Sequence, residues 1–301
     1  MRLLPLLLLA ACGDISNAWI LEDAAFLDAL PTEARHTVAL DVDSAAKGVA
    51  DAPSLLQLSY GVSVDVNGTI LQVLRTIDEV RALRPDERTE DGRRWGPYPW
   101  RDGVDVAVWV ERAGAGRFDW GVEALAADAT VSWITGTHYA GDTVAAGDGA
   151  FTWTFDEVAA LVGDPARGTV EVDYDNREGI DLLVAIEGVT DGSAAPATAD
   201  YAYRLVAGEG DFQYATTADL GDTPDGSPED VRVRTRWYQG GGGRADAVIT
   251  GGTFGGFVEQ WTQCWDPSLA ITYEHDEFGF VRPSGDEGAC VFPTFAEVDR
   301  I

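Results

Sequence analysis

Hydrophobic positions recur along the chain with two different spacings. In the first third they return every three or four residues, and the clearest such run consists of Val66, Ile70, Val73, Leu74, Ile77, Val80 and Leu83. That spacing places apolar side chains on one face of a helix. It predicts helical structure over residues 15–85, with a first helix at 18–30 that stops at Pro31. A long helix then begins near Ser54 and ends by Pro85, with Asn67-Gly68 as a position for a kink.

From residue 103 onward the hydrophobic residues alternate with polar ones. Short turn segments rich in glycine separate the alternating runs, which lie at 104–111, 118–123, 131–137, 151–155, 170–174, 182–186, 201–205, 212–216, 231–237, 245–249, 257–265 and 271–273. Alternation with a period of two is typical of strands that bury one face. The pattern predicts an antiparallel meander of about twelve strands over residues 103–275.

A sheet of this width needs a cover for its apolar face. Open sheets of more than about ten strands curl, split or close, and the apolar stripe of the long helix is the available partner. The predicted fold class is therefore α+β: a wide curved antiparallel sheet, or half-barrel, covered by a long N-terminal helix. The pattern leaves closure of the sheet undecided.

The first residues have the features of a targeting segment. Arg2 precedes an apolar run of about nine residues, Leu3 to Ala11, that contains Pro5 and is shorter than the roughly twenty residues of a membrane span. Leu9-Ala10-Ala11-Cys12 resembles a bacterial lipobox. The resemblance implies a lipoprotein signal peptide over residues 1–11, acylation of Cys12, and a body over residues 12–301. Gly13, where aspartate retains enteric lipoproteins at the inner membrane, favours the outer membrane.

Two cysteines remain once Cys12 is lipidated. Cys264 and Cys290 form an even pair in a chain predicted to be exported, which predicts a disulfide that ties down the segment 264–301. A metal site is the rival interpretation, but neither a Cys-x-x-Cys motif nor a histidine pair accompanies them.

The charge of the chain excludes partners that are recognised through phosphates. The sequence has 51 acidic and 21 basic residues, a net charge of −30, and Lys47 is its single lysine. Such a surface repels nucleic acid. A hydrophobic fraction of 46% and ten tryptophans also predict a packed core rather than disorder.

Short phrases in the chain resemble a known group of proteins. They are Phe26-Leu27-Asp28-Ala29-Leu30-Pro31, Trp95-Gly96-Pro97-Tyr98, Gln263-Cys264-Trp265-Asp266 and Cys290-Val291-Phe292-Pro293. These phrases look like those of lipoproteins from myxobacteria and their relatives, a group without an assigned activity, so the resemblance implies no catalytic residue. The predicted shape is also similar to periplasmic lipoprotein carriers of the LolA and LppX kind, which hold acyl chains between a curved sheet and helices.

Residues that could perform chemistry are few and scattered. The histidines, His36, His138 and His275, belong to no catalytic or metal-binding motif and are interpreted as ordinary surface or strand residues. The glycines at 240–243 and 251–256 are interpreted as hairpin turns, because no helix follows them as a phosphate loop requires. We therefore predict no catalytic residue, no cofactor and no metal.

Three charged clusters have alternative interpretations. Two are acidic and could suggest calcium, although both are expected to be solvated loops; they are Asp173, Asp175, Asn176 and Glu178, and Asp222, Asp225, Glu229 and Asp230. The third, formed by Arg232, Arg234 and Arg236, is expected to pair with acidic neighbours across the sheet, and an anionic ligand is the alternative.

Together these patterns predict a membrane-anchored exported lipoprotein with a non-enzymatic structural or interaction role. The alternative is a carrier for a lipid or other hydrophobic ligand in the concave face of the sheet. The expected partners are the outer membrane, reached through lipidated Cys12, and a hydrophobic ligand or an envelope protein. An enzyme is disfavoured because no nucleophile, base or metal set stands out. The oligomeric state stays open.

Overall fold

The computed structural model describes residues 17–40, 52–101, 103–190, 192, 197–218, 228–279 and 281–301. The α-helices are α1 (Asn17–Asp28), α2 (Glu33–His36), α3 (Ser54–Arg81) and α4 (Asp156–Val162), and short 3-10 turns are η2 (Gly252–Phe254) and η3 (Glu287–Ala289). The strands are β1 (Glu87–Arg88), β2 (Gly92–Arg101), β3 (Val104–Gly114), β4 (Arg117–Ala126), β5 (Ala129–Ala140), β6 (Gly147–Thr154), β7 (Arg167–Asp175), β8 (Ile180–Thr190), β9 (Ala197–Val206), β10 (Glu209–Ala218), β11 (Glu229–Tyr238), β12 (Gly243–Gly251), β13 (Gly255–Trp265), β14 (Ile271–Asp276) and β15 (Ser284–Gly285). The predicted signal peptide and Cys12 lie outside the described residues.

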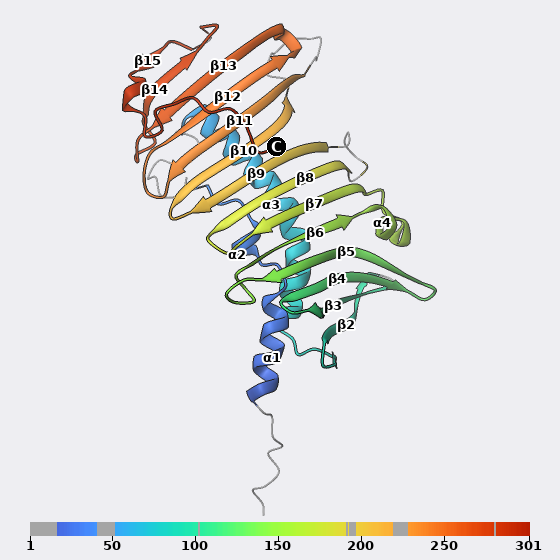
Figure 1. Cartoon of the computed structure of the whole chain (residues 1–301). Helices are drawn as coiled ribbons and strands as arrows, with labels where there is room; N and C mark the ends of the chain where they lie inside the picture. Colours follow the sequence, from blue (N-terminus) through green and yellow to red (C-terminus); the bar gives the residue numbers. More distant parts are fainter. Residues whose placement is uncertain are drawn as a thin grey trace, which may run out of the picture.

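All described strands belong to one antiparallel sheet. Its 15 strands follow one another in chain order from β1 to β15, and the two end strands do not pair with each other (Figure 1). The prediction of a large antiparallel meander is confirmed, and the question of closure is answered: the sheet is open. The predicted number of about twelve strands is wrong, because β1, β2 and β15 were not recognised.

The composition of β2 explains why the alternation pattern did not predict this strand. Its sequence contains Pro97 and Pro99 together with three arginines, and prolines are unfavourable inside a sheet. β1 pairs only with Arg93 and Arg94, so the prolines lie where β2 forms the edge of the sheet, and its register with β3 shifts around both. An edge strand with irregular pairing tolerates prolines because fewer of its N–H groups are needed.

The long helix is present but is not N-terminal. α3 has 28 residues, about 42 Å of helix, and α1 and α2 precede it in the chain. It continues through Asn67-Gly68 without a break. It begins beside β13, where Leu55 N–H donates to Gln263 Oε1 at 2.8 Å, and it ends beside β2, where Trp95 Nε1 donates to the Leu83 carbonyl at 3.3 Å. α3 therefore crosses the strands along one face of the sheet (Figure 1).

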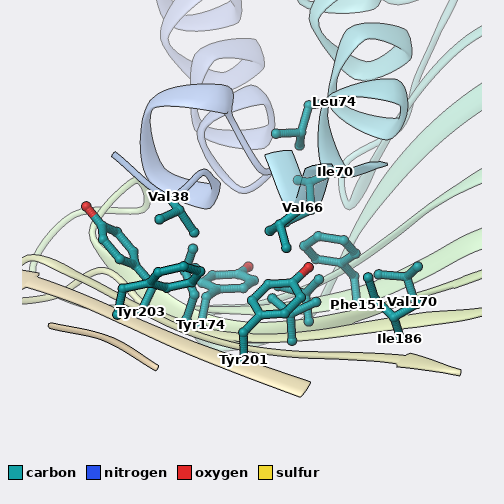
Figure 2. Packing of buried hydrophobic residues seen from close by; sticks show 14 of the residues in the cluster. Val38, Val66, Ile70, Leu74, Phe151, Val170, Tyr174, Ile186, Tyr201 and Tyr203 are labelled. Carbon is teal, nitrogen blue, oxygen red and sulfur yellow. The ribbon is translucent and has the colours of Figure 1, made fainter. Parts of the chain in front are cut away.

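The core lies between α3 and this inner face. Val66, Ile70, Leu74 and Ile77 of α3 are each at most 5% exposed. They meet aromatic and branched side chains that include Phe151, Val170, Tyr174, Ile186, Tyr201 and Tyr203 (Figure 2). The side chain of Val73, another residue of the predicted stripe, lies outside the described part. The alternation in the strands thus supplies the inner face, and the helical spacing supplies its cover.

Glycines directly opposite aromatic residues recur in the sheet. The cross-strand pairs are Gly121 with Trp109, Gly136 with Trp120, Gly149 with Tyr174, Gly210 with Trp237, and Gly243 with Trp265. A Cβ atom added at Gly121 would lie 2.9 Å from the Trp109 ring, and one added at Gly136 would overlap the Trp120 indole. Each aromatic ring therefore lies over the bare backbone of its neighbour, which fixes strand register.

Candidate functional site

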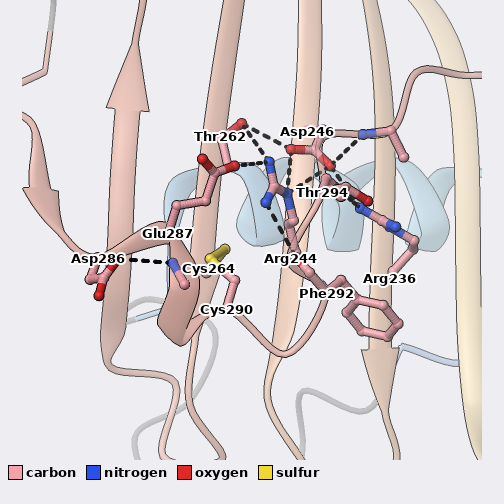
Figure 3. Close-up of a disulfide and its surroundings, with 12 residues drawn as sticks. Arg236, Arg244, Asp246, Thr262, Cys264, Asp286, Glu287, Cys290, Phe292 and Thr294 are labelled. Carbon is pink, nitrogen blue, oxygen red and sulfur yellow. Dashed lines mark hydrogen bonds and ion pairs between the residues drawn. A yellow bond between two sulfur atoms is a disulfide. The ribbon is translucent and has the colours of Figure 1, made fainter.

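The disulfide and the chain that follows it lie on the outer face of the sheet, opposite α3. Cys264 of β13 bonds to Cys290 with an S–S distance of 2.11 Å, so the structure contains the predicted disulfide (Figure 3). The chain then crosses the strands as an extended segment, which we call the C-terminal strap (residues 290–301). Near its end, Arg300 forms an ion pair with Asp181 of β8.

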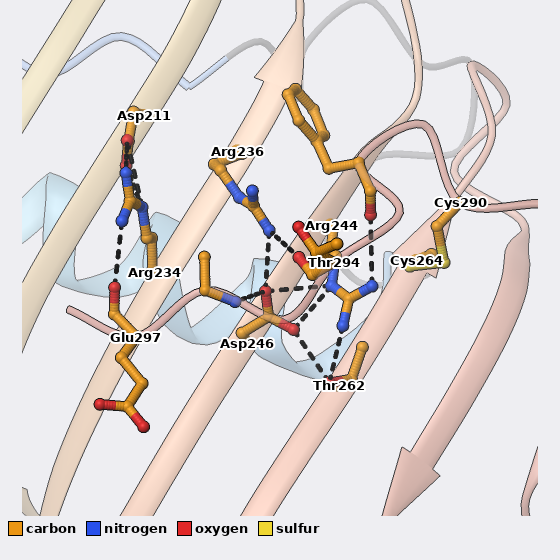
Figure 4. A network of polar contacts seen from close by, with 12 residues as sticks. Asp211, Arg234, Arg236, Arg244, Asp246, Thr262, Cys264, Cys290, Thr294 and Glu297 are labelled. Atoms are coloured by element: carbon orange, nitrogen blue, oxygen red, sulfur yellow. Dashed lines mark hydrogen bonds and ion pairs between the residues drawn. A yellow bond between two sulfur atoms is a disulfide. The ribbon is translucent and has the colours of Figure 1, made fainter. Parts of the chain in front are cut away.

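Arginines of β11 and β12 hold the strap. Arg244 Nη1 donates to the Phe292 carbonyl at 3.2 Å, Arg236 Nη2 to the Thr294 carbonyl at 2.7 Å, and Arg234 Nη1 to the Glu297 carbonyl at 3.1 Å (Figure 4). Backbone carbonyls of an irregular segment need donors, and these side chains supply them. The strap therefore occupies the face on which an anionic ligand was the alternative prediction.

A buried carboxylate neutralises two of these arginines. Asp246, 2% exposed, lies 2.7 Å from Arg244 Nε and 3.0 Å from Arg236 Nη2, and it also accepts from the Ala296 amide at 3.1 Å. Arg234 pairs with Asp211 at 2.6 Å in the same way. The predicted pairing of the arginine stripe with acidic neighbours is confirmed for Arg234 and Arg236. Because buried charges require partners, this network fixes the position of the strap.

The phrase 263–266 joins three parts of the fold. Gln263 caps the first turn of α3, whose preceding residue, Pro53, offers no side-chain hydrogen bond. Cys264 forms the disulfide, and Trp265 lies over Gly243. Asp266 Oδ1 accepts from the Ser268 and Ala270 amides and so closes the next turn. Every side chain of the phrase therefore has a structural task.

The phrase 95–98 also has structural roles. Trp95 is fully buried and binds the end of α3, as described above. Asp86 Oδ2 accepts from the Gly96 amide at 2.8 Å and from the Tyr98 hydroxyl at 2.7 Å, and these bonds hold the pKa of Asp86 below its ordinary value. The residues that carried the resemblance thus hold the strands, the helix and the strap together.

Two of the three histidines lie beside the same tyrosine, Tyr174. His138 is a strand residue of β5, as the sequence predicted, whereas His36 is a buried residue of α2, which corrects its interpretation as a surface or strand residue. His36 and His138 are each 3% exposed and flank Tyr174: the His36 ring lies 4.5 Å from the Tyr174 ring, and His138 Nδ1 lies 2.9 Å from the Tyr174 hydroxyl. Burial lowers the pKa of His36 to about 4 and lowers that of His138 as well. Both are neutral at pH 7, and His36 connects α2 to the sheet through Phe151 and Tyr174. Tyr174 lies 138 residues after His36 and 36 residues after His138 in the chain, so no local motif signals either contact.

In the acidic cluster at 173–178, Asp175 forms an ion pair with Arg177. Arg177 lies 2.5 Å from Asp175 and 3.5 Å from Asp148, and its hydrogen bond holds the pKa of Asp175 below the usual range. These residues border an open groove of about 480 Å³ on the outer face, which also contains Tyr139 and Leu183. Among the described residues no group of three or more His, Cys, Asp or Glu side chains could hold a metal ion. Asp222 and Asp225 of the second cluster lie outside the described residues.

Glu259 is a buried carboxyl that sequence reasoning missed. It is 2% exposed, and its Oε1 accepts from the Glu277 amide at 3.1 Å. Burial raises its pKa, and the nearby Asp276 adds to the increase. Its position on β13 follows the alternation of the strand, but nothing in the local sequence signals a carboxyl enclosed at the end of the sheet.

The interface between α3 and the sheet is where a carrier would hold its ligand. Buried side chains of α3 and of the sheet pack together there, and the groove described above has no residue of α3 in its lining. Some buried donors of the inner face have no hydrogen-bond partner among the described residues, namely the indole nitrogens of Trp120, Trp153, Trp237 and Trp261 and the hydroxyl of Tyr201. Sparse polar groups in an apolar setting are a feature of ligand sites, although a ligand would need space.

Comparison of the chain with protein-family models, curated proteins and solved structures finds no match. Among the helices of the described part, none is both long and apolar enough to span a membrane.

Proposed function

We propose that this chain is an exported lipoprotein, held on the outer membrane by acylated Cys12, with a non-enzymatic structural or interaction role. The observation on which the proposal rests is the segment Leu9-Ala10-Ala11-Cys12 after a short apolar run. The Cys264–Cys290 disulfide supports export, because such bonds persist in oxidising compartments. The structural contacts of the phrases 95–98 and 263–266 support a role without catalysis.

Replacing the acylated cysteine tests this proposal. The Cys12→Ser variant, which cannot accept the thioether-linked lipid, is expected to leave the membrane fraction, and intact mass should show the loss of the acyl groups. Gly13→Ser is the matched control and is expected to stay on the membrane. Equal retention of Cys12→Ser and the parent in membranes would contradict the lipoprotein proposal.

A carrier function is the second candidate, and the unpartnered donors of the inner face favour it. Because buried side chains of α3 pack on that face, we expect a ligand to enter where α3 moves away from the sheet. Mass spectrometry of the purified Cys12→Ser protein tests this alternative. A lipid recovered in stoichiometric amount would support a carrier, whereas its absence would favour the structural role.

A further inference from the structure

The first turn of α1 is apolar and uncovered. Trp19, Ile20 and Leu21 are 56%, 58% and 71% exposed. Successive residues of a helix point about 100° apart, so these three side chains surround most of the helix circumference. A helix that is apolar on all sides is normally covered by protein or lipid, and no described part of this chain covers this turn.

The second half of α1 prevents this turn from folding back onto the sheet. Phe26 is fully buried with its ring 5.7 Å from that of Phe118, and Asp23 bonds Arg93 at 2.6 Å and Arg88 at 3.0 Å. These contacts hold the helix to the β2 end of the sheet. The first turn therefore projects from that end, opposite β13–β15 (Figure 1).

The charges next to the turn are compatible with a lipid surface. The molecule as a whole has a charge of −30, but the two acidic residues that follow the turn are paired, since Glu22 lies 3.3 Å from Arg93 and Asp23 bonds the arginines named above. The turn thus has no unpaired carboxylate of its own to repel headgroups.

The distance along the chain to Cys12 restricts where the turn can be. Four residues, 13–16, lie between Cys12 and Asn17, and the five steps from one to the other reach at most about 17 Å. If Cys12 is acylated, as proposed above, α1 begins within that distance of the bilayer. Tryptophan is enriched at this depth because its ring is apolar and its N–H is polar.

We infer that the first turn of α1 inserts into the interfacial region of the lipid bilayer beside the acylated Cys12, and that it holds the body upright with the β13–β15 end away from the membrane. The inference rests on the proposed lipid anchor. We assign the bilayer as the partner that covers this turn. A second copy of the chain is disfavoured, because it would need a surface complementary to a single projecting turn.

Tryptophan quenching tests the insertion. The full chain, exported and processed in cells, is placed in phosphatidylcholine vesicles with or without brominated acyl chains, and the emission of the parent is compared with that of Trp19→Phe. We expect brominated lipid to remove most of the difference between parent and variant. Trp261→Phe, at the far end of the sheet, is the control. The difference in emission between the parent and this variant should be the same with and without brominated lipid.

The outcomes separate the inference from the lipid anchor. Intact mass first shows whether Cys12 is acylated, and a chain without acyl groups would overturn both. An acylated chain whose Trp19 emission ignores brominated lipid would overturn only the insertion. A Trp19 signal that changes with protein density rather than with brominated lipid would assign the turn to a second copy, against the inference.

Orientation is measured by energy transfer. A dye on Phe257→Cys, in the exposed β13 end, is paired with acceptor lipids in the vesicle. Transfer should be weak in the parent. It should rise when Trp19, Ile20 and Leu21 are all replaced by serine, because the anchored body can then tilt toward the bilayer. Equal transfer in both proteins would contradict an orienting role.

Discussion

At the scale of single residues, the packing of the sheet depends on glycines as well as on the large side chains opposite them. Gly136 lies directly opposite Trp120, which is fully buried and packs 5.6 Å from Phe151. The indole occupies the volume that any larger residue at position 136 would need. Since core side chains pack at near-crystalline density, neither ring can withdraw without disturbing the next.

The Gly136→Ala substitution should therefore destabilise the fold. Its methyl group would overlap the Trp120 indole and force a rotamer or backbone shift, at a cost of about 1–3 kcal/mol. Gly61→Ala is the control, because Gly61 lies in α3 with no atom near its added Cβ. It should instead gain about 0.5–1 kcal/mol. Denaturant unfolding measures both, and a loss of stability at Gly61 similar to that at Gly136 would contradict the cross-strand explanation.

At the scale of elements, the spacing of hydrophobic residues was enough to predict each helix or strand whose pattern is regular. The stripe from Val66 to Val80 predicted α3 closely, and alternation located β3 to β14. It failed for α4, which is only seven residues long, and for β2 with its two prolines. Contacts between distant elements, such as Gln263 with α3 or His36 with Tyr174, have no local signature. Of these long-range contacts, only the Cys264–Cys290 disulfide could be predicted from the sequence, because two cysteines remain once Cys12 is assigned to lipidation.

The contact between α3 and the sheet predicts the effect of a charge in the stripe. Ile77 is fully buried, so Ile77→Asp would place a carboxylate without a partner in the core and lower the unfolding free energy by on the order of 3–5 kcal/mol. Val64→Asp is the matched control in the same helix, because Val64 is 48% exposed. Thermal unfolding distinguishes them. If Ile77→Asp melts with the parent, α3 does not stabilise the sheet.

At the scale of the whole molecule, helices and strap bind opposite faces of one open sheet. α3 covers the inner face from β13 to β2, while the strap crosses the outer face from β13 to β8. An open sheet of 15 strands would otherwise be free to flex along its length. Both layers meet at residues 263 and 264, where Gln263 caps α3 and Cys264 anchors the strap. This continuity between the two layers suits the structural role proposed above.

Acid should weaken this assembly through the buried histidines before it breaks the surface ion pairs. The pKa of His36 is about 4 in the folded chain, below its ordinary value of 6.5, so the unfolded chain binds the proton more readily. The neutral form is required for folding, and stability falls as the pH drops from 6.5 toward 4. His138 acts in the same direction, whereas Glu259, with its raised pKa, acts in the opposite one. Asp175, whose pKa lies below 3.8, loses its contribution only in stronger acid.

Comparison with a variant isolates the contribution of His36. Between pH 7.5 and 5.0 its protonation should reduce the unfolding free energy of the parent by about 2 kcal/mol, and His36→Leu should lack this part of the decrease. Val38→Ala, a buried neighbour in sequence that does not titrate, should lower stability by the same amount at both pH values. Denaturant titrations at the two pH values give the change in unfolding free energy of each protein. Repulsion from the net charge and the titration of Glu259 affect parent and variants alike, so they cancel when these changes are compared. If His36→Leu retains the full decrease of the parent, then the contact of α2 with the sheet does not depend on a neutral histidine.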